Sequence, residues 1–192
     1  MRRGRVLALI LGGAVICAGA QAQDPEKPKA PAGGPAMEMP KPGPEMEKFK
    51  WVVGKWNVAE THEKSDWGPG GTGKGTMVVS LGPGGFSQTL SYSSTGPSGK
   101  FAGHGMSSWD PEAKVYRSAW ADSMTPGIMT MECREEGKDW VCSGEMMMMG
   151  KKCTMRSRAV APGPAGWTEV MEVSTEGGPY NKMISFEYKK SK

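Results

Sequence analysis

Histidine is scarce in this sequence, and the residue combinations that carry out catalysis are missing from it. Only two histidines occur among 192 residues, His62 and His104. No serine lies in a G-x-S-x-G sequence, and neither histidine is at a useful spacing from a nucleophile. Gly82–Gly85 reads Gly-Pro-Gly-Gly but joins two expected strands, so it lacks the helix N-terminus that binds phosphate. We therefore expect no catalytic residues, and an enzyme of unrecognised type is the least favoured of the functional hypotheses.

A concentration of charge of one sign is also missing. The formal net charge is +4. From residue 47 to the C-terminus the chain has 18 basic and 16 acidic residues, which leaves +2. The basic residues are scattered and form no stripe and no Arg-rich helix, so the sequence gives no indication of nucleic-acid binding.

Long apolar runs are confined to the N-terminus. Three arginines within the first five residues precede the apolar stretch Val6–Ala18, which is too short to span a membrane, and Ala20-Gln21-Ala22 is a small-x-small cleavage site. Residues 1–22 therefore read as a signal peptide cleaved near Ala22, and we expect a periplasmic or secreted protein without a transmembrane anchor. The alternative, a lipoprotein acylated at Cys17, has Ile16 where a small residue is needed.

The next segment, residues 23–47, is rich in Pro and Gly and has no apolar periodicity. Such a chain cannot bury enough surface to offset its ordering entropy, so we expect an extended, mobile linker. It contains Met37, Met39 and Met46. Thioether sulfur suits Cu(I), but incidental linker methionines are the preferred interpretation, and we expect no copper.

Residues 48–192 have the pattern of an all-β domain. In Phe86–Ser94, for example, Phe86, Leu90 and Tyr92 share one face and serines and threonine share the other. We expect ten strands: 55–63, 73–81, 85–94, 101–109, 115–121, 127–134, 139–146, 153–160, 167–174 and 180–189. The turns between them are short, which favours antiparallel up-and-down pairing, and closure into a barrel removes the exposed edges. A two-sheet sandwich is the alternative.

The stretch Phe49–Val58 opens this domain and contains Gly54-Lys55-Trp56. This sequence is similar to the G-x-W of lipocalin-type barrels, in which the Trp closes one end of the barrel. A longer set of positions resembles the bacterial domain of unknown function 1579 over residues 47–190. It comprises Trp109-Asp110, Val115-Tyr116, Trp120 and Asp122-Ser123 within Gly103–Ser123, then Gly150-Lys151, Arg156, Arg158, Lys182-Met183-Ile184 and Tyr188-Lys189.

The resemblance implies a calycin-like barrel and no established activity. Met146–Met149 departs from the family, where a more polar loop is expected. The acids that the resemblance highlights, Asp110 and Asp122, lie at strand ends, where Asp caps its own backbone, so we expect them to be structural.

Three cysteines remain after the signal peptide, and two of them can pair in an oxidising compartment. Cys133 and Cys142 flank one hairpin turn and are expected to lie opposite each other on the same face, so we favour their disulfide. Cys142 with Cys153 is the alternative, as are three reduced thiols. A metal site would need His62 or His104 in addition to the cysteines, and no C-x-x-C is present; haem bound through His104 is likewise not expected.

The leading functional hypothesis is a small apolar ligand held in the barrel. Four tryptophans are the expected boundary of such a site: Trp56, Trp109, Trp120 and Trp140. Methionine is adaptable and lines soft pockets, and Met146–Met149 fits this role, but packing of a solid interior explains both residue types equally well. The alternative is a ligand-free structural or interaction module of the cell envelope.

Overall fold

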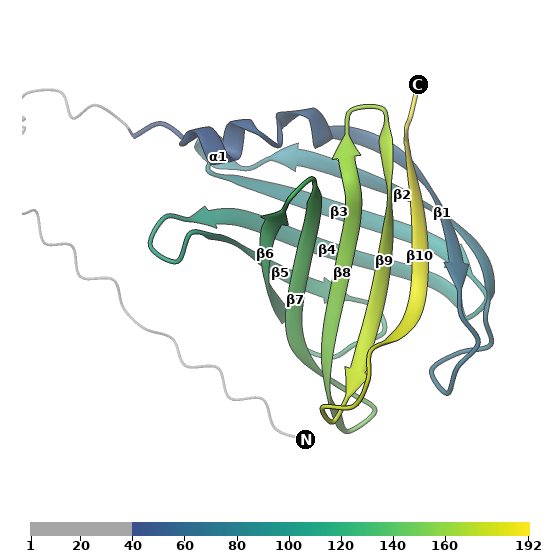
Figure 1. The fold of residues 1–192 in the computed structure, drawn as a ribbon. Coiled ribbons are helices and arrows are strands. Elements are labelled where there is room, and N and C mark those ends of the chain that lie inside the picture. Colours follow the sequence, from purple (N-terminus) through teal and green to yellow (C-terminus); the bar gives the residue numbers. More distant parts are fainter. Residues whose placement is uncertain (1–39) are drawn as a thin grey trace, which may run out of the picture. The chain divides into compact units, whose positions relative to one another are not determined.

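The computed structural model describes residues 40–192 (Figure 1). The expected signal peptide, nearly all of the expected linker, and Met37 and Met39 lie outside the described residues. Within residues 40–192 no helix is both long and apolar enough to cross a membrane.

The expected ten antiparallel strands are present and form a closed barrel. They are β1 (Gly54–His62), β2 (Gly71–Leu81), β3 (Ser87–Gly96), β4 (Gly99–Asp110), β5 (Val115–Asp122), β6 (Met129–Glu136), β7 (Asp139–Met148), β8 (Lys151–Gly163), β9 (Gly166–Thr175) and β10 (Asn181–Lys190). Each strand pairs with its neighbours in the chain, and β1 pairs with β10 to complete the circle. The all-β barrel prediction is confirmed, and the sandwich alternative is wrong.

Alternation along the strands decides which side chains point inward. In β1 the buried positions are Trp56, Val58 and Glu60, while the residues between them are exposed. Residues directly opposite in an antiparallel ladder share a face. The inward positions of β1 therefore identify, through the strand pairing, the inward positions of every other strand. One expectation fails here: Phe86 precedes β3 and is 41% exposed, because the 3-10 helix η2 (Pro83–Gly85) turns the chain just before it.

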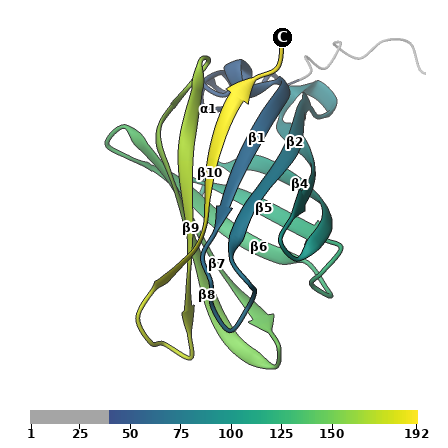
Figure 2. The same cartoon turned by 90° about the vertical axis from the view of Figure 1, so that its right-hand side faces the viewer.

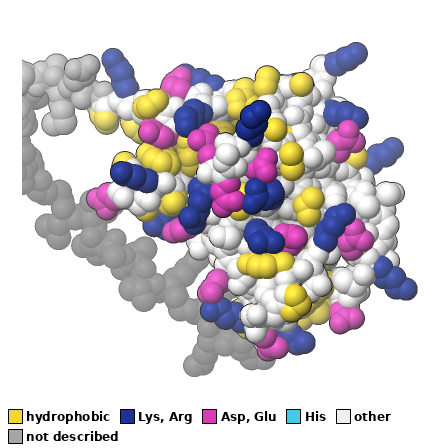
Figure 3. All heavy atoms as spheres, viewed as in Figure 1, with side chains coloured by type: hydrophobic (Ala, Val, Ile, Leu, Met, Phe, Trp, Pro, Cys, Tyr) yellow, Lys and Arg dark blue, Asp and Glu magenta, His cyan; other side chains and the backbone are white. Residues whose placement is uncertain are grey.

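The two ends of the barrel differ. One end carries the short helices α1 (Pro44–Glu47) and η1 (Lys50–Val52), and β10 also finishes there (Figures 1 and 2); we call it the cap end. The other end carries the connections β1–β2, β3–β4, β5–β6, β7–β8 and β9–β10; we call it the loop end. On the face formed by β7–β10, positive and negative side chains are interspersed (Figure 3), and Arg156 pairs with Glu172 there.

Helix α1 differs from the extended linker expected through residue 47. Pro44 occupies the first turn, where its missing N–H costs nothing. Met46 is 5% exposed and packs with Tyr116 and the two cysteines Cys133 and Cys142. The Tyr116 hydroxyl also donates to the Glu45 carbonyl at 2.9 Å. Burial of one apolar side chain in the barrel end therefore orders a segment whose composition alone favours an open chain.

Trp56 closes the cap end. It is completely buried, and its indole lies edge-on to Trp51 and Trp167 at centroid distances of 6.1 and 4.7 Å. Its Nε1 donates to the Val52 carbonyl at 2.7 Å, and the Lys190 ammonium lies 4.4 Å from the centre of its ring. The chain bends into β1 at Gly54, whose φ of 123° is open to glycine but costly for other residues.

The expected disulfide joins Cys133 to Cys142, which are directly opposite in the β6–β7 hairpin. Cys153 is the free, buried cysteine. It faces Met146 across the β7–β8 ladder, four residues along β7 from Cys142, so the alternative pairing is not made.

Candidate functional site

A group of polar side chains lies inside the barrel toward the loop end. Glu60 points inward from β1 with its side chain 3% exposed. It accepts a hydrogen bond from the Tyr92 hydroxyl of β3, and its other oxygen lies 2.8 Å from Nε2 of His62. His62 is 22% exposed, so the buried carboxylate orients an imidazole that solvent still reaches.

Glycines on the neighbouring strands make room for this group. A β-carbon on Gly73 of β2 would overlap the Glu60 carboxylate, and one on Gly75 would lie 2.6 Å from the Tyr92 hydroxyl. A β-carbon on Gly96 would lie 3.1 Å from Nε2 of His62. Larger residues at these positions would displace the polar side chains, so the glycine content of β2 and β3 is part of the site.

A second carboxyl group lies two strands away at the same level of the barrel. Glu60 is opposite Phe186 of β10, and Phe186 is opposite Glu169 of β9. Burial raises the pKa of Glu169, and hydrogen bonds from Ser157, Tyr188 and Trp167 only partly offset this. Burial, with the nearby carboxyl of Glu169, likewise raises the pKa of the Tyr188 hydroxyl well above its usual range.

Burial also raises the pKa of Tyr92, with a further contribution from its bond to Glu60. Both phenols therefore remain neutral hydrogen-bonding groups at physiological pH. No Lys or Arg occupies an inward strand position at this level within residues 40–192. The polar part of the interior thus offers carboxyl, phenol and imidazole groups without a full positive charge from Lys or Arg.

Apolar side chains cover the rest of the interior. Tyr92, Phe101 and Trp120 form a row of rings with centroids 6.1 and 6.4 Å apart. Gly103 allows this row, because a β-carbon there would overlap the Trp120 indole. The facing wall is rich in methionine and surrounds Cys153; its inward members are Met129, Met131, Met146, Met148, Met155 and Met171.

Several inward side chains at this level retain solvent-accessible surface. Phe101, Trp120, Glu169, Met171 and Phe186 are only partly buried although they face the inside of a closed barrel. Solvent therefore reaches part of the inward surface at this level. We call this region, from Glu60, Tyr92 and Trp120 across to Glu169 and Met171, the interior site.

The four predicted tryptophans do not form one site. Trp120 belongs to the interior site, where its Nε1 donates to Asp122 at 3.0 Å. Trp56 is packed in the cap-end core. Trp109 and Trp140 flank Tyr116 beneath α1, at ring distances of 4.8 and 4.7 Å, and each lines a surface groove.

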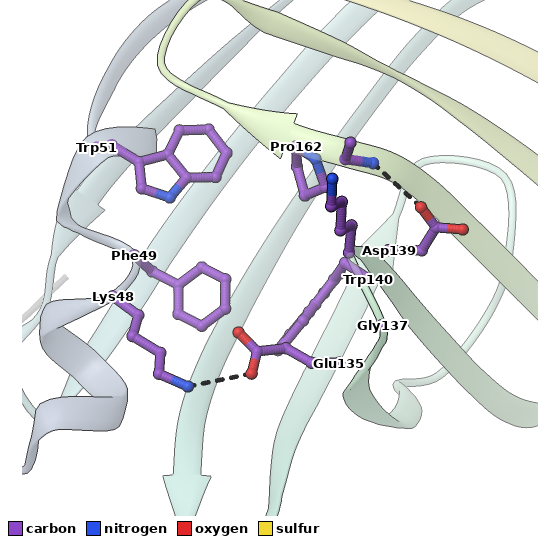
Figure 4. Close-up of a pocket in the computed structure, with 10 residues that line it drawn as sticks. Lys48, Phe49, Trp51, Glu135, Gly137, Asp139, Trp140 and Pro162 are labelled. Carbon is purple, nitrogen blue, oxygen red and sulfur yellow. Dashed lines mark hydrogen bonds and ion pairs between the residues drawn. The ribbon is translucent and has the colours of Figure 1, made fainter.

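The groove beside Trp140 has a volume of about 350 Å³ and lies at the cap end, between η1 and the β6–β7 turn. Figure 4 shows Phe49 and Trp51 on one side of it and Pro162 on the other. An ion pair of 3.0 Å joins Lys48 to Glu135 across one edge. Its charged groups largely neutralise one another and most belong to exposed turns, so the groove offers little to orient a ligand.

A second groove, of about 460 Å³, lies beside Trp109 on the other side of α1. Met46 and Phe86 contribute to it. Both grooves are lined in part by the segment that contains α1 and η1. They are spaces left between this segment and the end of the barrel on which it packs.

The remaining sequence candidates have structural surroundings. Asp110 accepts backbone N–H groups of Glu112 and Ala113 at 3.0 Å, and Asp122 accepts those of Met124 and Thr125 at 2.8 and 2.7 Å. His104 points outward and bonds to Ser91 at 3.0 Å. In the part of the chain that the structure describes, no three His, Cys, Asp or Glu residues group as metal ligands would.

Sequence reasoning missed Glu60 and Glu169. A signal for Glu60 was available: it shares the period-two phase of Trp56 and Val58, the two most apolar positions of β1. An acid on the apolar phase of a strand is unusual and points to a buried polar role. Glu169 carried no comparable signal, because the inward phase of β9 becomes clear only from its register with β10.

This chain is similar to solved structures. Rv2717c from M. tuberculosis is 10% identical, with a TM-score of 0.55 over 79% of this chain and 100% of that one, and this similarity shows the fold alone. The S-type phycobiliprotein lyase CPES from Guillardia theta is 10% identical with a TM-score of 0.49 (76% and 92% covered), and EF1p2_mFAP2b bound to DFHBI is 10% identical with a TM-score of 0.43 (76% and 98% covered).

No curated protein matches the sequence. Residues 41–190 match the family described as protein of unknown function (DUF1579). This match covers most of the chain and agrees with the resemblance in the sequence, so the chain belongs to the DUF1579 family.

Proposed function

We propose that this protein binds a small amphipathic molecule at the interior site. The observation that carries the proposal is the combination of partly exposed inward side chains with two inward carboxyl groups, Glu60 and Glu169. Carboxyl groups are costly to bury even when they have hydrogen-bonding partners, and a ligand that pairs with them would offset that cost. Ligand sites in proteins are likewise mainly apolar, with a few convergent polar groups.

The chemistry of the walls defines the ligand class. Methionine and aromatic side chains suit a flexible apolar body. The polar wall presents carboxyl, phenol and imidazole groups without a Lys or Arg, so a neutral or cationic hydrogen-bonding head group is favoured and a carboxylate is disfavoured. The Glu60–His62 pair, which solvent reaches, is the recognition point for that head group.

The proposal places the protein outside the cytoplasm. The N-terminal sequence supports this, and so does the Cys133–Cys142 disulfide, because such bonds persist in oxidising compartments. A binding protein there could carry or sequester an amphiphile that is poorly soluble in water.

The test titrates the protein with an alkyl amine, the matching alcohol and the matching carboxylate, all below their micelle concentrations. Because Trp120 lies in the interior site, we expect intrinsic tryptophan fluorescence to change as a probe binds. The change should saturate as expected for one binding site. We expect the amine and the alcohol to bind more tightly than the carboxylate. Glu60→Gln should weaken binding of the amine about tenfold, since a hydrogen bond to a charged group is lost.

Glu135→Gln is the matched control, because Glu135 is an exposed carboxylate that lines the groove beside Trp140. It should leave binding unchanged. If Glu135→Gln weakened binding of the amine and Glu60→Gln did not, the ligand would be bound in that groove and not at the interior site. Absence of saturable binding for all three probes would favour the ligand-free envelope module.

A further inference from the structure

The loop end of the barrel exposes an apolar rim. Its members lie on the β5–β6 connection and on the end of the β7–β8 hairpin, and have exposed fractions of 62% for Met124, 73% for Ile128, 59% for Met147 and 82% for Met149. Met149 and Ile128 are the two most exposed large hydrophobic residues within residues 40–192. Single exposed apolar residues need no explanation, but a group on neighbouring hairpins does.

The strand order brings the two hairpins together. Strands β6 and β7 are neighbours in the barrel; Ile128 directly precedes β6 and Met147 lies near the end of β7, so both are at the loop end. Both are exposed to solvent there. Met149 extends beyond them at the tip of the β7–β8 hairpin.

Folding does not explain a methionine at that tip. Met148 pairs with Lys151, so Met149 and Gly150 form a two-residue turn with φ values of 48° and 78°. Positive φ at both positions defines the type I′ turn, which prefers Asn or Asp before Gly. Met149 thus adopts a backbone conformation that is unfavourable for a residue with a long side chain. Its side chain is also largely exposed to water.

Two lysines follow the tip directly. Lys151 and Lys152 flank the apolar residues, and Lys152 pairs with Glu145 at 2.9 Å, which leaves this hairpin with a net charge of +1. Exposed apolar side chains beside basic ones are the combination that binds the interface of a bilayer with anionic head groups. A protein partner with an apolar patch would not require the lysines.

We propose that the loop end docks on the surface of an anionic phospholipid bilayer, with Met147, Met149 and Ile128 entering the head-group region. This position also directs the loop end of the barrel toward the lipid phase. The proposal goes beyond ligand binding, since docking requires only the rim and its lysines.

The test measures co-sedimentation of the mature protein with vesicles of phosphatidylcholine alone and with added phosphatidylglycerol. We expect binding to the mixed vesicles, about fivefold tighter than to the neutral ones for one net charge, and weakened by salt. Met149→Asn suits the turn better than the native residue, so it should fold normally and yet lose most of the binding. Lys151→Glu should abolish the preference for anionic vesicles.

Val160→Ser is the matched control, because Val160 is an exposed apolar residue at the cap end of the same strand as Lys151. It should bind like the native protein, and so should Glu60→Gln, which affects only the interior site. Native-like binding by Met149→Asn would overturn the proposal, as would equal loss in Val160→Ser. Absence of binding to either vesicle would overturn it and assign the rim to a protein partner.

Discussion

The interior carboxyl groups differ in their surroundings although they lie at the same level of the barrel. Glu60 has two polar partners, Tyr92 and the partly exposed His62. Glu169 is held by Ser157, Tyr188 and Trp167, and burial dominates its protonation. Because burial raises the pKa of Glu169, its protonated form, which can donate a hydrogen bond to a ligand, extends to higher pH than in an exposed glutamate.

The raised pKa of Glu169 predicts how stability depends on pH. An unfolded glutamate titrates near 4.5, and the folded one titrates higher. Between these two pKa values the unfolded chain has lost its proton while the folded protein keeps it, so each increase in pH favours unfolding. The contribution is complete below about pH 4.5 and is lost as the pH rises through the folded value.

This effect is measured by urea unfolding of the native protein and of the Glu169→Gln variant at a series of pH values. We expect the native free energy of unfolding to fall relative to the variant as the pH rises above 4.5. Glu135→Gln, at an exposed carboxylate, is the control and should follow the native curve. Parallel curves for the native protein and Glu169→Gln would contradict the prediction.

Among the elements, α1 shows how a single contact can order a segment. It has only one turn, too short to be stable alone. Met46 holds it against Tyr116 and the disulfide, and the Lys48–Glu135 ion pair of 3.0 Å adds little because both side chains are exposed. The Met46 contact and the Tyr116–Glu45 hydrogen bond therefore hold α1 more firmly than the ion pair does.

Met46→Ala should lower the free energy of unfolding by about 2–4 kcal/mol, as for other buried methionines. Met124→Ala, at a 62% exposed methionine, should change it by less than about 0.5 kcal/mol. Chemical denaturation checks both values. Equal effects would mean that α1 contributes nothing to the barrel.

The strands were predictable from the sequence, and α1 was not. Period-two alternation and turn residues such as Gly137 and Gly177 mark the hairpins, so all ten strands were expected within a few residues of their positions. The Cys133–Cys142 disulfide followed from the same hairpin geometry. Helix α1 depends on a distant pocket that local composition cannot reveal, and the interior site depends on registers between strands far apart in sequence.

The assignment of tryptophans shows the same limit. Trp56 was expected to close one end, and it does. Whether Trp109, Trp120 and Trp140 lie near Trp56 depends on the level of each residue along the barrel axis. That level follows from the register between strands and not from the local sequence. The register places Trp120 apart from the others, and only that one contributes to the interior site.

The most deeply buried large side chain and the interior site lie at different levels of the barrel. Aromatic rings pack around the completely buried Trp56 at the cap end, whereas Tyr92, Phe101 and Trp120 form a row of rings farther along the barrel axis. A substitution in that row is therefore expected to cost less stability than the loss of Trp56.

Trp56→Ala and Trp120→Ala compare the two levels. The first should cost about 3–5 kcal/mol, because it removes a completely buried indole. The second should cost about half as much or less, because Trp120 is only partly buried. Thermal and urea unfolding measure both. A loss well under 1 kcal/mol for Trp56→Ala would mean that Trp56 does not close the barrel.

An even number of strands brings both ends of the barrel segment to the same side: β1 begins and β10 finishes at the cap end. An affinity tag, a sensor surface or a fused fluorescent protein joined after Lys190 therefore lies about one barrel length from Met149. Immobilisation through the C-terminus would therefore attach each molecule at its cap end and leave the loop end accessible from the solution.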